Sequence, residues 1–379
     1  MMRAENGTVK ARETGGSRMG KVYPQLVVTP ANMKHNMEQV VALAAEGGME
    51  VNGVAKGFCC IPECCRAMLE AGCKSIGGAR TCDLKKLKEY DPTMPTLLTR
   101  IPMKSEASEV VAWADISLVS ELETLQALNE EALKQGKVHK VILMKDIGDR
   151  REGYYEQDEM TEVGVKVETE MPGLFLYGVG TNFGCYGSVC PTWEKLTDLV
   201  GCAEAIEAKI GRRLDIISTG GTQTLNLVPT KEVPERVNHL RCGICSITKA
   251  AYTWEADIPD RLDSFRLRAE IVELKEKPTM PNGLLGNAAL NEKRHYEDLG
   301  IRKRAIVAIG RQDFGEDKDS IIPVDPKIRI WGSSSDHTIL DLEDCETDYK
   351  LGDYVEFNIN YVACMHLTMS RDVNIVINE

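Results

Sequence analysis

Short apolar or β-branched segments alternate with amphipathic helical segments eight times between residues 51 and 245. This alternation is typical of repeated β–α units that build a parallel sheet. A doubly wound open sheet shows the same pattern, but eight units favour a closed barrel. The predicted strands cover residues 51–56, 74–79, 96–101, 115–120, 140–145, 173–180, 214–219 and 239–243. The sequence therefore predicts an α/β fold with a TIM-like (β/α)8 barrel.

The pattern changes after about residue 255, where apolar residues alternate with polar ones in runs separated by Pro, Gly, Asn and Asp turns. Residues 261–278 and 354–369 are two such runs, and they predict a C-terminal all-β domain. The segment YPQLVVT (23–29) precedes the barrel and is a candidate strand of that domain. We therefore expect a disordered extension over 1–22, a barrel domain over 23–250 and a β-rich domain over 251–379.

Composition excludes several classes of protein. The formal charge is −12, from 46 basic and 58 acidic residues, which disfavours a nucleic-acid surface. No apolar stretch reaches the roughly 18 residues of a membrane span, and the first 20 residues lack the apolar centre of a signal peptide. Thirteen cysteines, with adjacent pairs at 59–60 and 64–65, would mispair in an oxidising compartment. We expect a cytoplasmic enzyme that contacts neither membrane nor nucleic acid.

A lysine ends the first predicted strand, in the segment VNGVAK. Burying its ammonium costs several kcal/mol unless the charge is paired, solvated or neutralised. In a barrel, functional groups lie where a strand ends, on the C-terminal face. Lys56 is therefore a candidate for a functional amine, with an ordinary lysine that reaches water as the alternative.

The ends of the last two predicted strands carry groups that suit a phosphate. The loop STGGTQT (218–224) offers hydroxyls and two glycines, which permit positive φ angles and close backbone approach. A tight turn into a helix at 222–227 would explain the same residues. Arg241 follows on the eighth strand, where its alternative role is a salt bridge to a neighbouring strand. With Lys56, these groups describe a site for pyridoxal 5'-phosphate, in which lysine forms a Schiff base and arginine faces the ring nitrogen.

At this point the sequence resembles the alanine racemase family of pyridoxal-phosphate enzymes, and within it the ornithine racemase branch. The family likeness lies in GVAK (53–56), STGGTQT (218–224), RVNHLRCGI (236–244) and NINYVA (358–363). The closer likeness lies in residues 178–191, 304–315 and 332–344. The resemblance implies a barrel followed by a β-domain, a free amino acid as substrate, and a homodimer whose active sites are shared between subunits.

The resemblance also implies roles for individual residues. Lys56 is the Schiff-base lysine and one of the acid/base groups, and Arg241 faces the pyridine nitrogen. The phosphate candidates are Ser218, Gly221, Thr222, Gly243, Ile244 and Tyr361.

Two departures from the family concern the substrate and the second proton-transfer group. Cys60 stands where alanine racemases carry a tyrosine, and residues 278–291 lack the tyrosine that the partner subunit supplies. Candidates for the second group are therefore Asp336 and His337, with Asp313, Cys185 and Tyr186 as further options; His337 could equally be an ordinary turn residue. Asp313 and Asp336 could also bind a distal ammonium, with Asn182 and Tyr186 as further substrate contacts. These carboxylates favour ornithine or another basic amino acid, and an alanine or broad-specificity racemase is the alternative.

Two other activities are compatible with the same cofactor. Metal-assisted aldolases and dehydratases of D-amino acids bind a metal through a His-x-Cys pair, but His337 is followed by Thr338 and Ile339, so we expect no metal. Non-catalytic pyridoxal-phosphate-binding proteins lack a β-domain, whereas this chain has one predicted. We therefore predict an amino-acid racemase that removes the α-proton and returns it to the opposite face.

Overall fold

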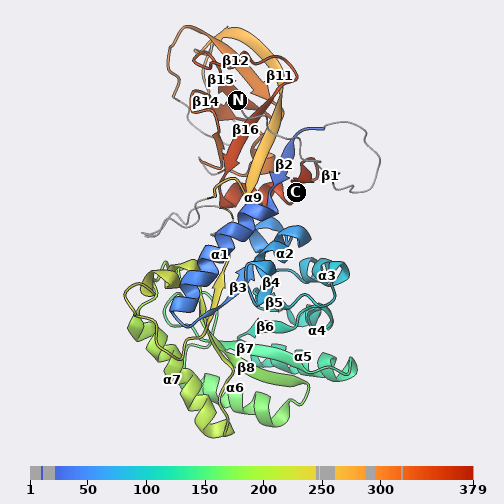
Figure 1. Ribbon diagram of the computed structural model, residues 1–379, viewed down its shortest axis with the longest axis vertical. Helices are drawn as coiled ribbons and strands as arrows, with labels where there is room; N and C mark the ends of the chain where they lie inside the picture. Colours follow the sequence, from blue (N-terminus) through green and yellow to red (C-terminus); the bar gives the residue numbers. More distant parts are fainter. Residues whose placement is uncertain are drawn as a thin grey trace. The chain divides into compact units, whose positions relative to one another are not determined.

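The computed structural model describes residues 10–11, 22–244, 247, 261–286, 295–316 and 319–378 (Figure 1). The chain divides into two compact units. One unit comprises Ala31–Arg261, and the other comprises Leu262–Glu379 together with Met1–Pro30. Among the helices in the described ranges, none is both long and apolar enough to cross a membrane.

The first unit contains a closed barrel of parallel strands in the order β10-β3-β4-β5-β6-β7-β8-β9. All eight strands overlap the segments predicted from the sequence, so the predicted (β/α)8 barrel is confirmed. The barrel strands are β3 (Glu50–Val54), β4 (Ser75–Gly78), β5 (Thr96–Leu98), β6 (Ile116–Val119), β7 (His139–Met144), β8 (Leu174–Gly180), β9 (Ile216–Gly220) and β10 (His239–Cys242).

Helices surround the outside of these strands (Figure 1). The α7 helix shows how the sequence defines its ends: the Thr192 hydroxyl accepts a hydrogen bond from the Lys195 N–H at 3.4 Å, and Gly211 ends the helix with φ 74°. The helices are α1 (Pro30–Glu46), α2 (Pro62–Glu70), α3 (Thr81–Tyr90), α4 (Ala107–Trp113), α5 (Leu122–Lys134), α6 (Gln157–Glu170) and α7 (Trp193–Ile210), with short 3₁₀ helices η1 (Lys56–Phe58), η2 (Lys104–Glu106) and η3 (Thr222–Leu227).

The barrel interior has an apolar part and a polar part. A buried apolar cluster is formed by Leu97, Leu118, Ile142, Met144 and Ile216, which come from β5, β6, β7 and β9. Because strand side chains alternate between faces, Ser218 shares the interior face with Ile216. Next to it on β10, His239 and Arg241 are also buried, and both are on the same face of their strand. Buried polar groups require hydrogen-bond partners, and the partners of Ser218, His239 and Arg241 are described with the candidate site below.

The second unit is built on a nine-stranded sheet with the path β1-β17-β2-β11-β12-β15-β14, to which β13 and β16 are added. Strand β2 pairs antiparallel with β11, so the segment that precedes the barrel joins the β-domain, as we expected. The strands are β1 (Lys10–Ala11), β2 (Gln25–Val28), β11 (Phe265–Pro278), β12 (Ile301–Val307), β13 (Ile321–Pro323), β14 (Arg329–Ser333), β15 (Thr338–Asp341), β16 (Tyr354–Ile359) and β17 (Asn374–Ile377).

The second unit differs from the prediction at one of its predicted strand runs. The strand pattern over 354–369 ends at Ile359, and the rest forms helix α9 (Tyr361–Leu367). The Asn360 side chain accepts a hydrogen bond from the Ala363 N–H at 2.9 Å and caps the helix. Ala363, Cys364 and Leu367 are buried at helical spacing. A second short helix, α8 (Arg311–Phe314), also interrupts the β-structure.

The edges of the predicted domains compare with the structure as follows. Of the extension expected to be disordered, Lys10–Ala11 form a strand paired with β17, and residues 1–9 and 12–21 lie outside the described residues. The predicted boundary at 250/251 also lies outside them, and the two units divide at Arg261 and Leu262.

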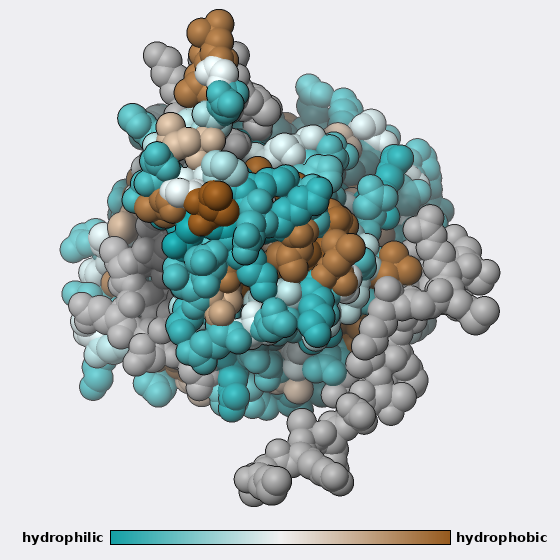
Figure 2. Space-filling model, turned by 90° about the horizontal axis from the view of Figure 1, so that it is seen from above, coloured by the Kyte–Doolittle hydropathy of each residue, from teal (hydrophilic) through white to brown (hydrophobic). Residues whose placement is uncertain are grey.

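On the face seen in Figure 2, hydrophobic residues form several separate patches among hydrophilic ones.

Candidate active site

Lys56 begins the short helix η1 directly after barrel strand β3. The chain then reverses through Cys59 and Cys60, whose φ angles of 49° and 48° lie in the left-handed region that residues other than glycine rarely adopt. Such strained positions persist where the surrounding structure holds them. The Cys60 side chain is fully buried, so the position at which the family carries a tyrosine holds a packed thiol.

The Lys56 side chain opens into a cavity of about 300 Å³ at the C-terminal end of the barrel. We call it the Lys56 cavity; it is lined by Lys56, Ala79, Thr99, Arg100, Ile101, Arg151 and Glu152. The surrounding protein lowers the pKa of the Lys56 ammonium, chiefly through burial, and the charges of Arg151 and Arg241 lower it further. Protein atoms surround the amine closely enough to lower its pKa, yet the residue as a whole is exposed, so Lys56 is reachable through the cavity.

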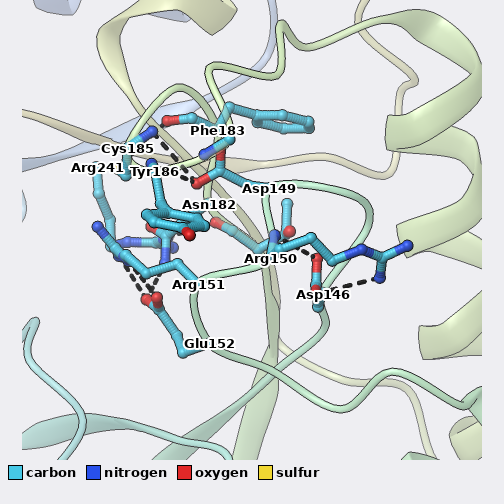
Figure 3. Close-up of polar contacts among 12 residues, drawn as sticks. Asp146, Asp149, Arg150, Arg151, Glu152, Asn182, Phe183, Cys185, Tyr186 and Arg241 are labelled. Atoms are coloured by element: carbon cyan, nitrogen blue, oxygen red, sulfur yellow. Dashed lines mark hydrogen bonds and ion pairs between the residues drawn. The ribbon is translucent and has the colours of Figure 1, made fainter.

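Arg151 and Glu152 form an ion pair in the loop after β7. The Asn182 amide, which follows β8, donates a hydrogen bond to the Glu152 carboxylate. Figure 3 shows Arg151 and Glu152 facing each other beside Asn182, whereas Arg150 points away toward Asp146. We did not predict this pair from the sequence. Its only sequence signal is a charged segment, DRRE, that follows a barrel strand on the C-terminal face.

Asp149 organises the neighbouring loop after β8. It is buried, and its carboxylate accepts backbone N–H groups of Tyr186 at 3.0 Å and Gly187 at 3.1 Å, with longer contacts to Cys185 and Val189 (Figure 3). These bonds hold the loop that carries the predicted substrate contact Tyr186, a residue that is 74% exposed. The loop therefore presents an aromatic ring beside the Arg151–Glu152 pair.

Arg241 is buried on β10, with its guanidinium directed at the ends of β8 and β9. Nη2 donates to the Thr181 carbonyl at 2.6 Å and to Asn182 Oδ1 at 2.9 Å, and Nη1 donates to the Ser218 hydroxyl. Burial lowers the pKa of Arg241 to about 10, partly offset by Glu152. The side chain therefore remains a cation at neutral pH. Its hydrogen bonds go to carbonyl, hydroxyl and amide oxygens, so the alternative role of a salt bridge to a neighbouring strand does not describe them.

The loop after β9 brings the backbone close to these groups. A Cβ added at Gly220 would lie 2.4 Å from Arg241 Nη2, and Gly221 has φ 92°. Gly243 approaches the Val54 carbonyl equally closely, since an added Cβ would lie 2.3 Å from that oxygen. Gly243 and Ile244 directly follow β10, next to this loop. Because these glycines lack a Cβ, the backbone at the end of β9 lies close to Arg241, and the backbone after β10 lies close to Val54 at the end of β3.

The hydroxyls of this loop have partners within the protein. Ser218 is fully buried, and its Oγ lies 2.7 Å from His239 Nδ1 as well as accepting from Arg241. The Thr222 hydroxyl contacts the Cys242 sulfur at 3.3 Å, and Thr219 contacts Thr224 at 2.9 Å. The predicted phosphate role of Ser218 and Thr222 remains a prediction.

The other predicted residues belong to the second unit. Asp336 and His337 are exposed in the loop between β14 and β15. Asp313 lies in α8, where its carboxylate accepts a hydrogen bond from Ser370 at 2.9 Å. Backbone bonds from Arg311 to Ser334 (2.9 Å) and from Gln312 to Ser335 (3.0 Å) bring these two segments together. Tyr361 is the first residue of α9.

A second, larger cavity of about 700 Å³ lies at the opposite, N-terminal end of the barrel. It is lined by residues at the starts of strands and the segments before them, including His139, His239, Lys140, Tyr177 and Glu50. We call it the N-terminal cavity. Among the described residues, no group of three or more His, Cys, Asp or Glu side chains is arranged to hold a metal ion.

Comparisons with known proteins identify the family. The model for the alanine racemase N-terminal domain matches residues 28–248. The chain is 38% identical to ornithine racemase of Acetoanaerobium sticklandii, covering 91% of this chain and 96% of that protein. It is 34% identical to lysine racemase of Thermotoga maritima, covering 92% and 96%.

Solved structures with the same fold include alanine racemase of Clostridium difficile 630, with a TM-score of 0.71, 21% identity and coverage of 94% of this chain and 97% of that one. D-threonine aldolase from Filomicrobium marinum has a TM-score of 0.66 at 16% identity, covering 91% and 89%. At such identities these likenesses concern the fold alone. The match of the family model and the two sequence relatives show that the chain belongs to the alanine racemase family and is an amino-acid racemase.

Proposed function

We propose that this chain interconverts the L- and D-forms of ornithine, or of another basic amino acid, with pyridoxal 5'-phosphate bound at the C-terminal end of the barrel. The observation that carries the proposal is a reachable lysine of lowered pKa on a cavity directly after β3, with a buried arginine on the adjacent strand β10. The substrate class rests on the ornithine and lysine racemases to which the chain is similar. When bound, pyridoxal phosphate delocalises the negative charge left on the α-carbon after its proton is removed.

The residues present suit this cofactor. Lys56 supplies the amine, and Arg241 supplies a fixed cation for the ring nitrogen. A guanidinium has five N–H donors, and Arg241 contacts four acceptor atoms among the described residues, which leaves a donor for that nitrogen. Gly221, Gly243 and Ile244 bring backbone to the neighbouring strand ends, where a phosphate suits the amides, with Ser218, Thr222 and Tyr361 as further candidates.

Lys56 carries the cofactor and moves a proton at the α-carbon. Its lowered pKa increases the fraction of neutral amine near neutral pH, and a neutral amine can accept the α-proton. Inversion requires a second group that donates a proton to the opposite face, and in the reverse direction the Lys56 ammonium is the donor. Because Arg241 can only donate hydrogen bonds, it favours an unprotonated ring nitrogen.

Arg151 is one of two arginines that line the Lys56 cavity, and it is the one that we propose binds the α-carboxylate of a substrate. Glu152 and Asn182 hold it through the contacts described above. Asn182 and Tyr186, at the end of β8, are the further substrate contacts that we propose. A planar guanidinium held by a carboxylate has a defined orientation, which suits recognition of a second carboxylate.

For the opposite face of the substrate we propose the segment with Asp336 and His337, supplied by the partner subunit of a homodimer. His337 would exchange the second proton, and Asp313 or Asp336 would bind the distal ammonium. Mixing a Lys56→Ala protein with a His337→Ala protein tests this: restored activity in mixed dimers supports a shared site, and none contradicts it.

The location that we propose for this protein is the cytoplasm. The 12 described cysteines are all free thiols, which suits a reducing compartment.

The experiment that tests the function uses the purified protein, pyridoxal phosphate and a panel of L-amino acids in heavy water. We expect visible absorbance from bound cofactor, deuterium at the α-position of ornithine or lysine, and formation of the D-form on a chiral column. Faster exchange on alanine would indicate an alanine racemase instead. Cleavage of D-threonine that depends on an added divalent metal would indicate an aldolase, and colour without exchange would indicate a cofactor carrier.

A further inference from the structure

A continuous chain of hydrogen bonds runs through the barrel interior from Arg241 to the N-terminal cavity. Arg241 Nη1 donates to Ser218 Oγ, and Ser218 Oγ lies 2.7 Å from His239 Nδ1. His239 in turn lines the N-terminal cavity. Ser218 is 0% exposed, and His239 and Arg241 are each 5% exposed, so water does not replace these contacts. The Arg241 guanidinium, which is proposed to face the cofactor, is therefore held by contacts on the side of the N-terminal cavity.

The direction of each hydrogen bond in this chain is determined. A guanidinium N–H can only donate, so Ser218 Oγ is the acceptor and its own hydrogen points to His239 Nδ1. Burial lowers the pKa of His239 to about 3, and the charge of Arg241 lowers it further, so the imidazole is neutral. Nδ1 is then the acceptor, and the ring proton is on Nε2. One tautomer of His239 therefore satisfies the whole chain.

A second histidine–serine pair provides a comparison within the same barrel. His139 Nε2 lies 2.8 Å from Ser117 Oγ; burial lowers the pKa of His139 to about 4, and it also lines the N-terminal cavity. Ser117 is adjacent to Leu118, whose side chain is part of the interior cluster, so Ser117 faces the surrounding helices. The pair therefore has similar burial and chemistry, but its serine accepts no charged donor in any contact recorded for the described residues.

We propose that His239 is a positioning residue that acts through Ser218 to hold the Arg241 guanidinium in the orientation that the cofactor ring requires. The proposal rests on the proposed function for the group that Arg241 faces. A serine hydroxyl alone can rotate and leave the guanidinium without its acceptor. With His239 as a fixed acceptor, the hydroxyl has a single orientation, and Arg241 is held at Nη1 as well as at Nη2.

The test compares His239→Leu and His239→Asn with His139→Leu and His139→Asn. Leucine removes the acceptor, whereas the asparagine carbonyl can occupy the place of Nδ1. We expect His239→Leu to shift the visible absorbance of bound pyridoxal phosphate and to lower kcat about 10- to 100-fold with little change in KM, the range expected for losing a hydrogen bond to a charged group. His239→Asn should restore most of both properties. Both His139 variants should match the wild type in absorbance and kcat.

A measurement without cofactor separates this inference from the proposed function. In the cofactor-free protein, the ¹⁵N shifts of the His239 imidazole should report a neutral ring protonated at Nε2, and Ser218→Ala should shift them without affecting His139. A charged ring, the other tautomer or an unchanged spectrum overturns the chain even if the protein racemises ornithine. Conversely, a correct spectrum in a protein that binds no pyridoxal phosphate would contradict the proposed function alone.

Two further results bear on the positioning role. Equal loss of kcat in His239→Leu and His139→Leu would mean that the two pairs serve only packing, and the proposal would be wrong. If His239→Leu does not fold, Ser218→Ala and its matched control Ser117→Ala test the same chain. There a loss of kcat and an absorbance shift confined to Ser218→Ala support it, and equal behaviour overturns it.

Discussion

The two ends of the barrel differ in how their charged groups are held. At the N-terminal end, the cavity of about 700 Å³ is lined by lysines with separate partners: Lys88 pairs with Asp115 at 2.7 Å, and the Lys140 ammonium lies 4.6 Å from the centre of the Tyr177 ring. At the C-terminal end, the cavity of about 300 Å³ is smaller, but the charges around it act on one another, and burial lowers the pKa of Lys56. The larger cavity is therefore not the better candidate for catalysis.

What distinguishes the smaller cavity is that its charges depend on each other. Arg151 and Arg241 both lower the pKa of Lys56, and Glu152 raises it. Asn182 connects Glu152 to Arg241, because its amide nitrogen donates to one and its oxygen accepts from the other. Groups with perturbed pKa values that converge on one cavity are typical of active sites. Matched substitutions at the two ends of the barrel test this difference.

The largest effect is expected at the two lysines. Lys56→Met should lower racemisation by at least about 100- to 10,000-fold, the contribution typical of a group that transfers a proton. It should also remove the visible absorbance of bound cofactor. Lys140→Met, in the N-terminal cavity, removes the same charge and should leave activity close to that of the wild type. Deuterium exchange at the α-carbon measures both, and comparable losses in the two variants would remove the distinction between the cavities.

A smaller effect is expected from crowding Arg241. The Cβ of Gly220→Ala would lie 2.4 Å from Arg241 Nη2 and 2.7 Å from the Thr181 carbonyl, so the guanidinium must move. Overpacking of this kind costs about 1–3 kcal/mol, and we expect activity to fall about 10- to 100-fold. Gly201→Ala is the control, because no atom lies within 4 Å of its added Cβ in helix α7. Thermal unfolding should show Gly201→Ala at least as stable as the wild type.

A moderate effect on substrate binding is expected at Glu152. Glu152→Gln keeps a side chain of the same shape but loses the charge that holds Arg151. Charge-assisted hydrogen bonds are roughly twice as strong as neutral ones. We expect KM for the amino acid to rise about tenfold, equivalent to about 1.4 kcal/mol, with a smaller change in kcat. Glu50→Gln, at the rim of the N-terminal cavity, is the control and should leave KM unchanged. A normal KM for Glu152→Gln would exclude Arg151 as the carboxylate-binding group.

The sequence predicted the framework of the site better than its contacts. The eight barrel strands could be predicted because buried parallel strands read as short apolar runs between helices. That Lys56 and Arg241 lie toward the C-terminal end of the barrel could be predicted, because Lys56 follows β3 closely and Arg241 lies in the second half of β10. Arg151 and Glu152 lie in an irregular loop, where no periodicity indicates which charges turn inward.

The direction of single side chains also depended on tertiary structure. The sequence indicated a phosphate role for the Ser218 hydroxyl but not its contacts with Arg241 and His239 on the interior face of β9. Helix α9 was missed because one cap, Asn360, decides between the strand and helix patterns of the residues that follow. Local patterns therefore predicted where the strands end, and packing decided which atoms face the site.

The last prediction concerns stability at low pH, where the two histidine pairs should behave alike. Burial lowers the pKa of His139 to about 4 and that of His239 to about 3, from an ordinary value of 6.5. Between those values the unfolded chain binds a proton that the folded chain does not, so each histidine makes the protein less stable as pH falls from 6.5. The slope is about 1.4 kcal/mol per pH unit for each group.

Removing either histidine should reduce this dependence. Urea unfolding of the cofactor-free protein, measured from pH 6.5 down to about 4, should give a shallower slope by about one proton for both His139→Asn and His239→Asn. Besides burial, Asp115 raises and Lys137 lowers the pKa of His139, and Arg241 lowers the pKa of His239. Unchanged slopes in both variants would mean that these imidazoles are not buried as neutral groups. Equal slopes combined with unequal kcat would show that burial is common to the two pairs and that contact with Arg241 is what sets His239 apart.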